Sequence, residues 1–227
     1  MARLLSLETS TQVCSVAIHQ QGELLAFREI KEPRSAASQL AVMIDAVMKE
    51  SGMQAAMLNG VVVASGPGSY TGLRIGVATA KGICFALDLP LVAVNTLDLL
   101  AWQAKKLLSD TSALLCPMLD ARRMEVYCKV VDFNLTEVEP TQAKIVDENS
   151  FNSYLEKTTV YFIGEGATKC REIITHANAK FLDEVVPNAV PLGEMGIQKW
   201  HRQDFEDVAS FEPYYLKDFL IRKPTTS

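Results

Sequence analysis

The stretch from Asn59 to Leu87 places the tightest limit on the fold, because it contains the signals of a strand, a glycine-rich turn and a helix in immediate succession. Val61–Ala64 is a short apolar run of mostly β-branched residues, which predicts a buried strand. Serine, glycine and proline follow at residues 65–69 and indicate a tight turn. From Leu73 to Leu87 the apolar residues recur at helical spacing without a proline, and Thr71 is the expected N-cap.

Such a unit could bind phosphate, because backbone N–H groups and the positive end of the helix dipole point toward one place. Arg74, in the first turn of the helix, would add a positive charge there. The glycines at positions 66, 68 and 72 match neither the dinucleotide fingerprint nor the P-loop. A phosphate contact and a plain strand-to-helix turn are therefore both open.

The predicted helix also carries small residues four apart, Gly72, Gly76 and Ala80, with Thr79 and Gly82 close to the same face. A glycine inside a helix costs roughly 1 kcal/mol relative to alanine. This stripe therefore indicates that another backbone approaches closely, either from the same chain or from a second subunit. In the second case, an arginine or glutamate at Gly76 or Ala80 is expected to block dimerisation and to leave the monomer folded.

The composition excludes several classes of protein. Of the 227 residues, 48% are hydrophobic and 22% charged, as in a globular protein, and the net charge of −5 argues against a broad nucleic-acid surface but not against a local basic patch. The apolar runs are shorter than the roughly 20 residues that span a membrane, and the N-terminus does not resemble a signal peptide. Five cysteines without a C-x-x-C pair favour reduced thiols in the cytoplasm, and three scattered histidines predict no metal site.

The order of predicted elements indicates two related α/β subdomains, residues 1–109 and 110–227, with the C-terminal tail around Pro213–Tyr215 packing back on the first. The first half contains three strands, a helix, the central strand and helix, and a further strand and helix: Arg3–Glu8, Val13–His19, Glu23–Ile30, Ser35–Ser51, the central unit, Leu91–Val94 and Thr96–Leu108. The second half partly repeats this order: strands Ala113–Leu119 and Glu125–Val131, a strand near Lys144–Val146, a helix Phe151–Glu156, a strand Thr159–Ile163, a helix from Gly164 to about His176, and the end of a short helix at Ile197–Trp200.

Two βββαβα units with an acid closing the first strand resemble the actin, Hsp70 and sugar-kinase architecture, which holds Mg-ATP between its lobes. Glu8 closes the first strand here, so Glu8, Thr9, Ser10 and Arg74 are candidate vestigial phosphate ligands. The turn lacks the glycine that lets a backbone approach a phosphate closely. The obvious partners from the second half are Asp120 and the glycines at positions 164 and 166; Glu8, Asp120 and Glu125 could also be paired carboxylates, although acids at strand ends are usually solvated.

Several segments together resemble the bacterial TsaB (YeaZ) family, in the order in which that family has them. They are Leu4–Thr11 (LLSLETST), Gly66–Gly82 (GPGSYTGLRIGVATAKG), Asn95–Leu97 (NTL), Asp120–Tyr127 (DARRMEVY), Gly164–Ala167 (GEGA) and Pro213–Lys217 (PYYLK). Two positions depart from the family: Glu8 stands where it usually has aspartate, and Ala36-Ala37 where it commonly has a histidine followed by serine or alanine. Neither position is expected to be a ligand.

This resemblance implies an α/β fold of two actin-like (ASKHA, RNase H-like) subdomains, each a mixed sheet flanked by helices. It implies a non-catalytic scaffold subunit in the synthesis of N6-threonylcarbamoyladenosine beside the anticodon of tRNA. Such a subunit dimerises with the catalytic paralogue TsaD, or with itself when alone, works with the ATPase TsaE, reaches tRNA through the complex, and leaves ATP and metal to its partners. The implied dimer face comprises Leu40, Ile44, Val47, Gly72, Leu73, Gly76, Thr79, Ala80 and Ile83.

Two other functions are weighed against this one. An ATPase or small-molecule kinase of the same fold would use its own nucleotide site at Glu8, Thr9, Ser10 and Arg74. A peptidase is disfavoured, because Ser69 lacks the G-x-S-x-G context and the histidines do not pair.

Overall fold

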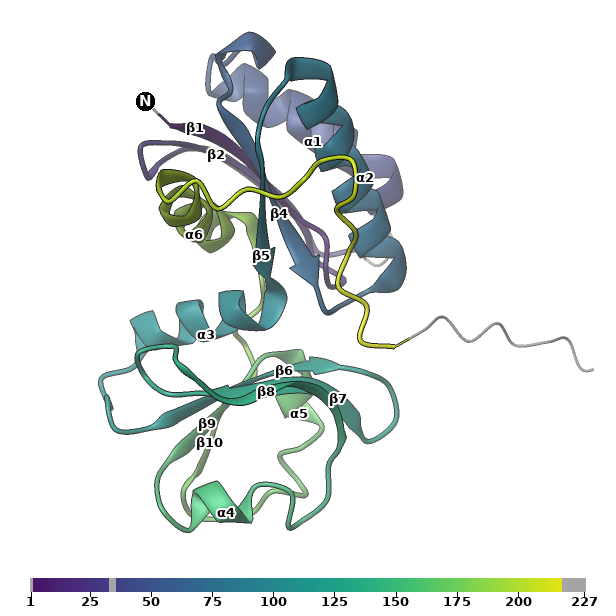
Figure 1. Ribbon diagram of the computed structural model, residues 1–227. Coiled ribbons are helices and arrows are strands. Elements are labelled where there is room, and N and C mark those ends of the chain that lie inside the picture. The colour runs from purple at the N-terminus through teal and green to yellow at the C-terminus, as the bar shows by residue number, and fades with distance from the viewer. Residues whose placement is uncertain (1, 33–35, 218–227) are drawn as a thin grey trace, which may run out of the picture.

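Two five-stranded mixed sheets form the centres of two lobes, one from each half of the chain (Figure 1). This computed structural model describes residues 2–32 and 36–217. The first sheet has the order β3-β2-β1-β4-β5, made of β1 (Arg3–Glu8), β2 (Cys14–Gln20), β3 (Glu23–Ile30), β4 (Gly60–Gly66) and β5 (Leu91–Asn95). The second has the order β10-β9-β6-β7-β8, made of β6 (Leu114–Asp120), β7 (Glu125–Val131), β8 (Glu137–Ile145), β9 (Val160–Ile163) and β10 (Ala179–Leu182).

The two sheets share one topology. In each, the first three strands of the lobe pair antiparallel, and the first, fourth and fifth pair parallel. The helices are α1 (Ala36–Glu50), α2 (Tyr70–Leu87), α3 (Thr96–Leu107), α4 (Asn152–Leu155), α5 (Glu165–Thr168) and α6 (Ala189–His201), with a short 3₁₀ helix, η1 (Ala55–Met57). The predicted pair of actin-like subdomains is confirmed.

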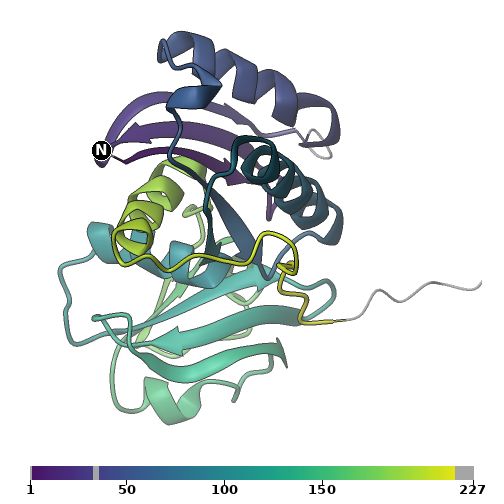
Figure 2. The ribbon, with the colours of Figure 1, turned by 45° about the horizontal axis from the view of Figure 1, so that its top comes forward.

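The central strands are buried on both faces, and the alternation of their side chains divides the first lobe into two cores. Leu5 and Leu7 of β1 face α1 and α2. Leu4 faces the other way, into a cluster with Leu192 and Ile197 of α6. The first sheet is therefore covered by α1 and α2 on one side and by α6 on the other, as Figure 2 also shows.

The last helix of each half packs on the sheet of the other half. Leu100 and Ala104 of α3 belong to a core with Leu115 and Ile163 of the second sheet. In return α6 lies on the first sheet, where the Ala189 backbone N–H donates to Ser15 Oγ at 2.9 Å. The tail then crosses the first lobe (Figure 2), and the Tyr214 backbone N–H donates to the Ser65 carbonyl oxygen at 2.7 Å. Residues 189–217 thus lie largely on the lobe that the first half of the chain builds.

The predicted helix from Gly164 to His176 is wrong, because α5 ends at Thr168. Irregular turns follow it, which the β-branched run at residues 173–175 favours over a helix. The chain then forms β10, a strand that the sequence analysis missed. The third strand of the second lobe is longer than predicted: it begins at Glu137 and contains Pro140, which an edge strand tolerates.

The helix that was expected to end near Trp200 is α6, with thirteen residues. Its start was missed because Pro191, Gly193 and Gly196 are poor helix formers. Pro191 lies in the first turn, where the missing N–H costs nothing, and the Asn188 side chain caps the Val190 N–H at 3.0 Å. All five cysteines are buried and free. No helix within the described ranges is both long and apolar enough to cross a membrane.

Candidate functional site

The turn after β1 holds three of the four candidate phosphate ligands, Glu8, Thr9 and Ser10, and all three are buried. The Ser10 backbone N–H and hydroxyl donate to Glu8 Oε1, at 2.6 and 2.5 Å. The Thr9 hydroxyl donates to the Gly72 carbonyl oxygen at 2.8 Å. The structure therefore brings these residues together, but it satisfies their donors within the chain.

The Glu8 carboxyl group is unusual because it is fully buried and its second oxygen, Oε2, has no hydrogen-bond partner among the described residues. Burial raises the pKa of Glu8 to about 7, although the two bonds from Ser10 act in the opposite direction. The group is thus protonated in a large share of molecules at neutral pH. No exposed surface gives a substrate access to it.

The start of α2 closes on the same turn. Ser69 is the N-cap, with its hydroxyl accepting from the Gly72 N–H at 3.3 Å, so the prediction of Thr71 was wrong by two residues. The reason is a tertiary contact: the Ser69 backbone N–H donates to the Ser10 carbonyl oxygen at 2.6 Å, which holds Ser69 outside the helix. The helix dipole therefore points toward a turn that the chain itself fills.

The small-residue stripe has the same explanation. A Cβ at Gly72 would collide with the carbonyl oxygen of Thr9, and a Cβ at Gly76 with the Thr9 hydroxyl. Ala80 is fully buried in the first-lobe core. The backbone whose approach the stripe predicts thus belongs to this chain. A charged residue at Gly76 or Ala80 is consequently expected to disturb the fold, which corrects the expectation that it would leave the monomer intact.

The remaining charged candidates are each engaged elsewhere. Arg74 is exposed, with its guanidinium carbon 5.1 Å from the centre of the Tyr70 ring. Asp120 forms an ion pair with Lys169, and Glu125 with Lys217. The structure therefore gives Asp120 a cationic partner in the second lobe and Glu125 one in the C-terminal tail, and it leaves Glu8 in the core of the first lobe.

The second-lobe glycines repeat the packing of the first lobe. Gly164 has φ +96°, and a Cβ there would lie 2.7 Å from the Met118 carbonyl oxygen. A Cβ at Gly166 would lie 2.7 Å from the backbone of Leu119. Both glycines thus press against β6, and this turn is filled as well. In the part of the chain that the structure describes, no three His, Cys, Asp or Glu residues are grouped as metal ligands.

The predicted dimer residues divide into two groups. Six of them are buried in the chain, and these are Leu40, Val47, Gly72, Leu73, Gly76 and Ala80. The other three, Ile44, Thr79 and Ile83, line a surface groove of about 370 Å³ between α1 and α2. Met48, Ala78, Gly82 and Ala86 complete its apolar walls. We call this surface the α1–α2 groove.

Large exposed apolar side chains stand on the same helices as the groove. The Phe85 side chain on α2 is 86% exposed, Val42 on α1 is 60% exposed, and Met57 in η1 is 41% exposed. The sequence analysis missed all three. Phe85 could have been found, because it shares helical spacing with the small residues Ala78 and Gly82, which are also exposed. Apolar side chains exposed on the helices that line an apolar groove are typical of interaction sites in soluble proteins.

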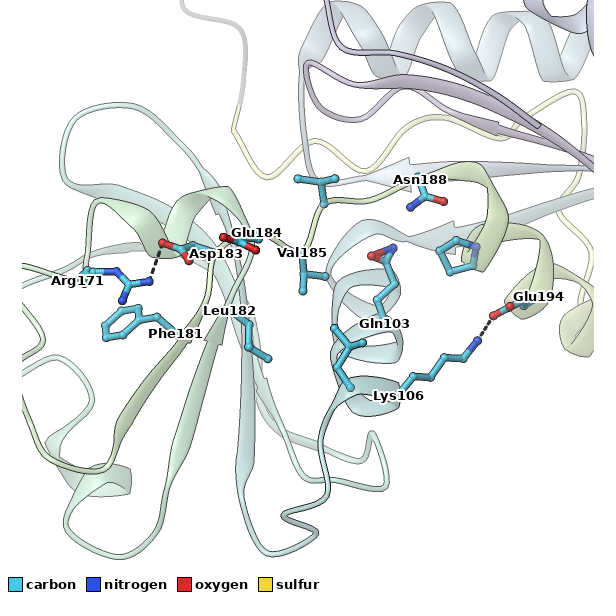
Figure 3. Close-up of a pocket in the computed structure, with 13 residues that line it drawn as sticks. Gln103, Lys106, Arg171, Phe181, Leu182, Asp183, Glu184, Val185, Asn188 and Glu194 are labelled. Carbon is cyan, nitrogen blue, oxygen red and sulfur yellow. Dashed lines mark hydrogen bonds and ion pairs between the residues drawn. The ribbon is translucent and has the colours of Figure 1, made fainter.

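A larger cavity, of about 730 Å³, lies away from both regions, between α3, β10 and the segment that leads into α6 (Figure 3). Its walls carry two ion pairs, Arg171 with Asp183 at 2.8 Å and Lys106 with Glu194. These pairs leave Glu184 as the remaining charged residue of the lining. The cavity contains none of the predicted site residues.

The chain is similar to proteins of tRNA modification. A family model described as "TsaD: tRNA N6-adenosine threonylcarbamoyltransferase" matches residues 32–221. The tRNA threonylcarbamoyladenosine biosynthesis protein TsaB of Haemophilus influenzae is 27% identical over 229 residues, which cover 97% of this chain and 95% of that protein. The chain belongs to this family, in its TsaB (YeaZ) group.

Two further comparisons agree with this assignment. The protein of the same name in Escherichia coli is 34% identical over 125 residues, which cover 55% of this TsaB-family chain and 53% of the relative. YeaZ from Pseudomonas aeruginosa superposes with a TM-score of 0.81 at 24% identity, covering 95% of this chain and all of that one. The family resemblance read from the motifs is therefore confirmed, and so is the fold that it implied.

Proposed function

We propose that this chain is a non-catalytic subunit of the cytoplasmic complex that transfers threonylcarbamoyl to N6 of the tRNA adenosine beside the anticodon. It pairs with a TsaD-type catalytic paralogue through the α1–α2 groove, works with the ATPase TsaE, and forms a self-dimer when alone. It binds neither nucleotide nor metal by itself, because these belong to its partners. The role in threonylcarbamoyladenosine synthesis agrees with the names of its relatives.

One contrast supports the proposal. The turn after β1, where a nucleotide would bind in this fold, is filled by the chain itself, whereas the α1–α2 groove on the outer helices is exposed. The Thr9 and Ser10 hydroxyl groups donate to the Gly72 carbonyl oxygen and to the Glu8 carboxylate, so neither hydroxyl is free to donate to a phosphate. The α1–α2 groove, by contrast, has apolar walls, and Phe85 beside it buries almost nothing. Aromatic anchors at the centre of an apolar patch are typical of the residues that dominate interface energies.

The interface is tested by Phe85→Glu, measured by sedimentation of the chain alone and mixed with its TsaD-type paralogue. We expect at least a hundredfold weaker association in both assemblies, with unchanged thermal unfolding, since the side chain is exposed in the monomer. Leu24→Glu is the matched control, because Leu24 is an exposed leucine on the edge strand β3, outside the groove. Normal assembly of Phe85→Glu would place the interface elsewhere.

The absence of catalysis is tested by calorimetric titration with Mg-ATP. We expect no heat of binding at millimolar nucleotide, because the turn that would hold the phosphates is filled by α2. Micromolar binding that weakens in Glu8→Ala would contradict the proposal. It would then favour an ATPase or kinase of this fold.

A further inference from the structure

Arginine side chains without a polar partner are concentrated in one place. The structure describes seven arginines, of which Arg3, Arg28 and Arg171 bind Gln20, Glu50 and Asp183. The other four, Arg74, Arg122, Arg123 and Arg202, have no side-chain hydrogen bond or ion pair within the described ranges. Three of these four, all except Arg202, lie near the last described residues of the C-terminal tail: Arg74 lies over Tyr70, which contacts Tyr215, and the turn with Arg122 and Arg123 precedes Glu125, which pairs with Lys217.

The β6–β7 turn presents two of them. Arg122 and Arg123 are exposed, with φ of +70° and +51°, a backbone conformation that glycine would adopt at lower cost. Lys169 stabilises this turn through its ammonium group. The group donates to the carbonyl oxygens of Arg123 at 2.8 Å and of Glu125 at 2.6 Å, and it forms an ion pair with Asp120. The turn is thus fastened by a lysine while both arginine side chains reach solvent.

The start of α2 and the tail provide the third arginine and an aromatic surface. The rings of Tyr70 and Tyr215 are 4.7 Å apart, and Arg74 lies over Tyr70. Tyr214, next in the chain, is 44% exposed. Lys217 pairs with Glu125 and so ties the tail to the β6–β7 turn, and Figures 1 and 2 both show the tail ending beside that turn.

Two acids of this region form ion pairs with lysines and not with the arginines. Asp120 is taken up by Lys169, and Glu125 by Lys217. Burial and the nearby Asp120 charge raise the pKa of Glu165, and the Lys169 charge acts in the opposite direction. Glu212 in the tail is the exposed acid nearest in sequence to the tyrosines. In a chain of net charge −5, three guanidinium groups without an ion pair lie near the exposed ring of Tyr214 and the half-buried rings of Tyr70 and Tyr215.

We propose that this arginine–tyrosine cluster, made of Arg74, Arg122, Arg123, Tyr70, Tyr214 and Tyr215, binds the single-stranded loop of the tRNA substrate. Guanidinium groups without carboxylate partners bind phosphates, and exposed aromatic rings stack on unpaired bases. The rest of the chain carries an excess of acidic residues and repels RNA, so the RNA is expected to approach the chain at the cluster. The inference rests on the proposed function and replaces an indirect role in tRNA contact with a direct one.

The test measures the affinity of an unmodified tRNA transcript for the chain assembled with its TsaD-type paralogue. In the double variant Arg122→Gln/Arg123→Gln we expect about tenfold weaker binding. The slope of log K against log salt should fall by roughly 1.4, since each phosphate contact to a single strand contributes roughly 0.7. Tyr214→Ala should weaken binding at least fivefold through lost stacking. Arg202→Gln, an unpaired arginine outside the cluster, is the control and should change nothing.

Two results would overturn this inference. One is wild-type affinity and salt slope in the double variant. The other is displacement of the RNA by poly-glutamate as readily as by unlabelled tRNA, because that outcome would identify a general anion site.

An assay of threonylcarbamoyladenosine synthesis distinguishes a failure of this inference from a failure of the proposed function. The double variant should raise the KM for tRNA about tenfold and keep the rate at saturating tRNA. If the wild-type chain supports no synthesis with its partners, the proposed function fails, whereas the RNA-binding measurements still decide the role of the cluster.

Discussion

The two lobes have the same strand order but differ in the helices that cover their outer faces. In the first lobe, α1 and α2 have fifteen and eighteen residues and bury the central strands under a continuous layer. In the second, α4 and α5 have four residues each, and turns complete the cover. The duplicated sheet therefore carries two different outer surfaces, and only the first offers a pair of long helices to a partner.

The polar interior differs in the same direction. Among residues 2–32 and 36–217, seven of the eight buried polar residues lie in the first lobe or at the start of α3: Ser6, Glu8, Thr9, Ser10, Ser15, His19 and Thr96. The eighth, Lys129 in the second lobe, is paired with Asp98 and Glu137. The first lobe thus contains a polar seam, which α2 and α6 cover.

The largest loss of stability is expected from a substitution in the first lobe, at the contact between α2 and the turn after β1. Gly72→Ala places a Cβ against the Thr9 backbone, which cannot move aside like a flexible side chain, so we expect a loss of about 3 kcal/mol or more in the free energy of unfolding. Gly166→Ala meets the Leu119 backbone in the second lobe, and should cost less because the four-residue α5 can shift. Urea unfolding measures both.

Gly82→Ala is the matched control on α2, because no atom lies within 4 Å of the added Cβ. It should stabilise the protein by about 1 kcal/mol through helix propensity. If Gly72→Ala were as stable as the wild type, the close packing of α2 on the β1 turn would be wrong, and the contrast between the lobes would lose its basis.

The polar seam predicts a pH dependence of stability, which Glu8 carries. Because the pKa of Glu8 rises from 4.5 to about 7 on folding, the folded state holds the proton more tightly, and this stabilisation is lost as pH rises through that window. Between pH 5 and pH 8 the loss is about 2 to 3 kcal/mol. Glu8→Gln should remove this loss in urea unfolding at the two pH values.

His19 acts in the opposite sense and must be separated from Glu8. Its buried ring has no hydrogen-bond partner among the described residues, and burial lowers its pKa despite the nearby Glu194 charge. Stability is therefore lost from this group as pH falls below its ordinary pKa of 6.5. An unchanged pH dependence in Glu8→Gln, with His19 present in both proteins, would show that Glu8 does not carry the effect.

Local patterns predicted most of the sheet, and tertiary contacts explain the errors. Short apolar runs between turn residues were sufficient to predict β1 to β5. The start of α6 was hidden by Gly193 and Gly196, which are small because His19 and Val62 press against them. That reason lies more than a hundred residues away in sequence, so helix propensity could not reveal it.

The candidate site was misread for a related reason. A four-residue spacing of small residues on a helix indicates close packing but not the identity of its neighbour. Gly76 faces Thr9 of the same chain, whereas the open face of α2 carries Phe85. In the sequence, an apolar residue on the exposed face of a helix cannot be told from a core residue. The two are distinguished by which face of the helix packs against the sheet, and this is known only from the structure.

The smallest expected change in stability comes from the N-cap of the helix that follows the fourth strand of each lobe. Ser69 caps α2 with its hydroxyl, whereas α5 begins at Gly164, which has no side chain. Ser69→Ala should therefore cost about 1 kcal/mol in the free energy of unfolding. Thr71→Ala, at the position first expected to be the cap, is exposed and should change it by less than about 0.5 kcal/mol. Equal losses in the two variants would mean that α2 begins later than Tyr70, and that the contact between Ser69 and Ser10 does not define where this helix starts.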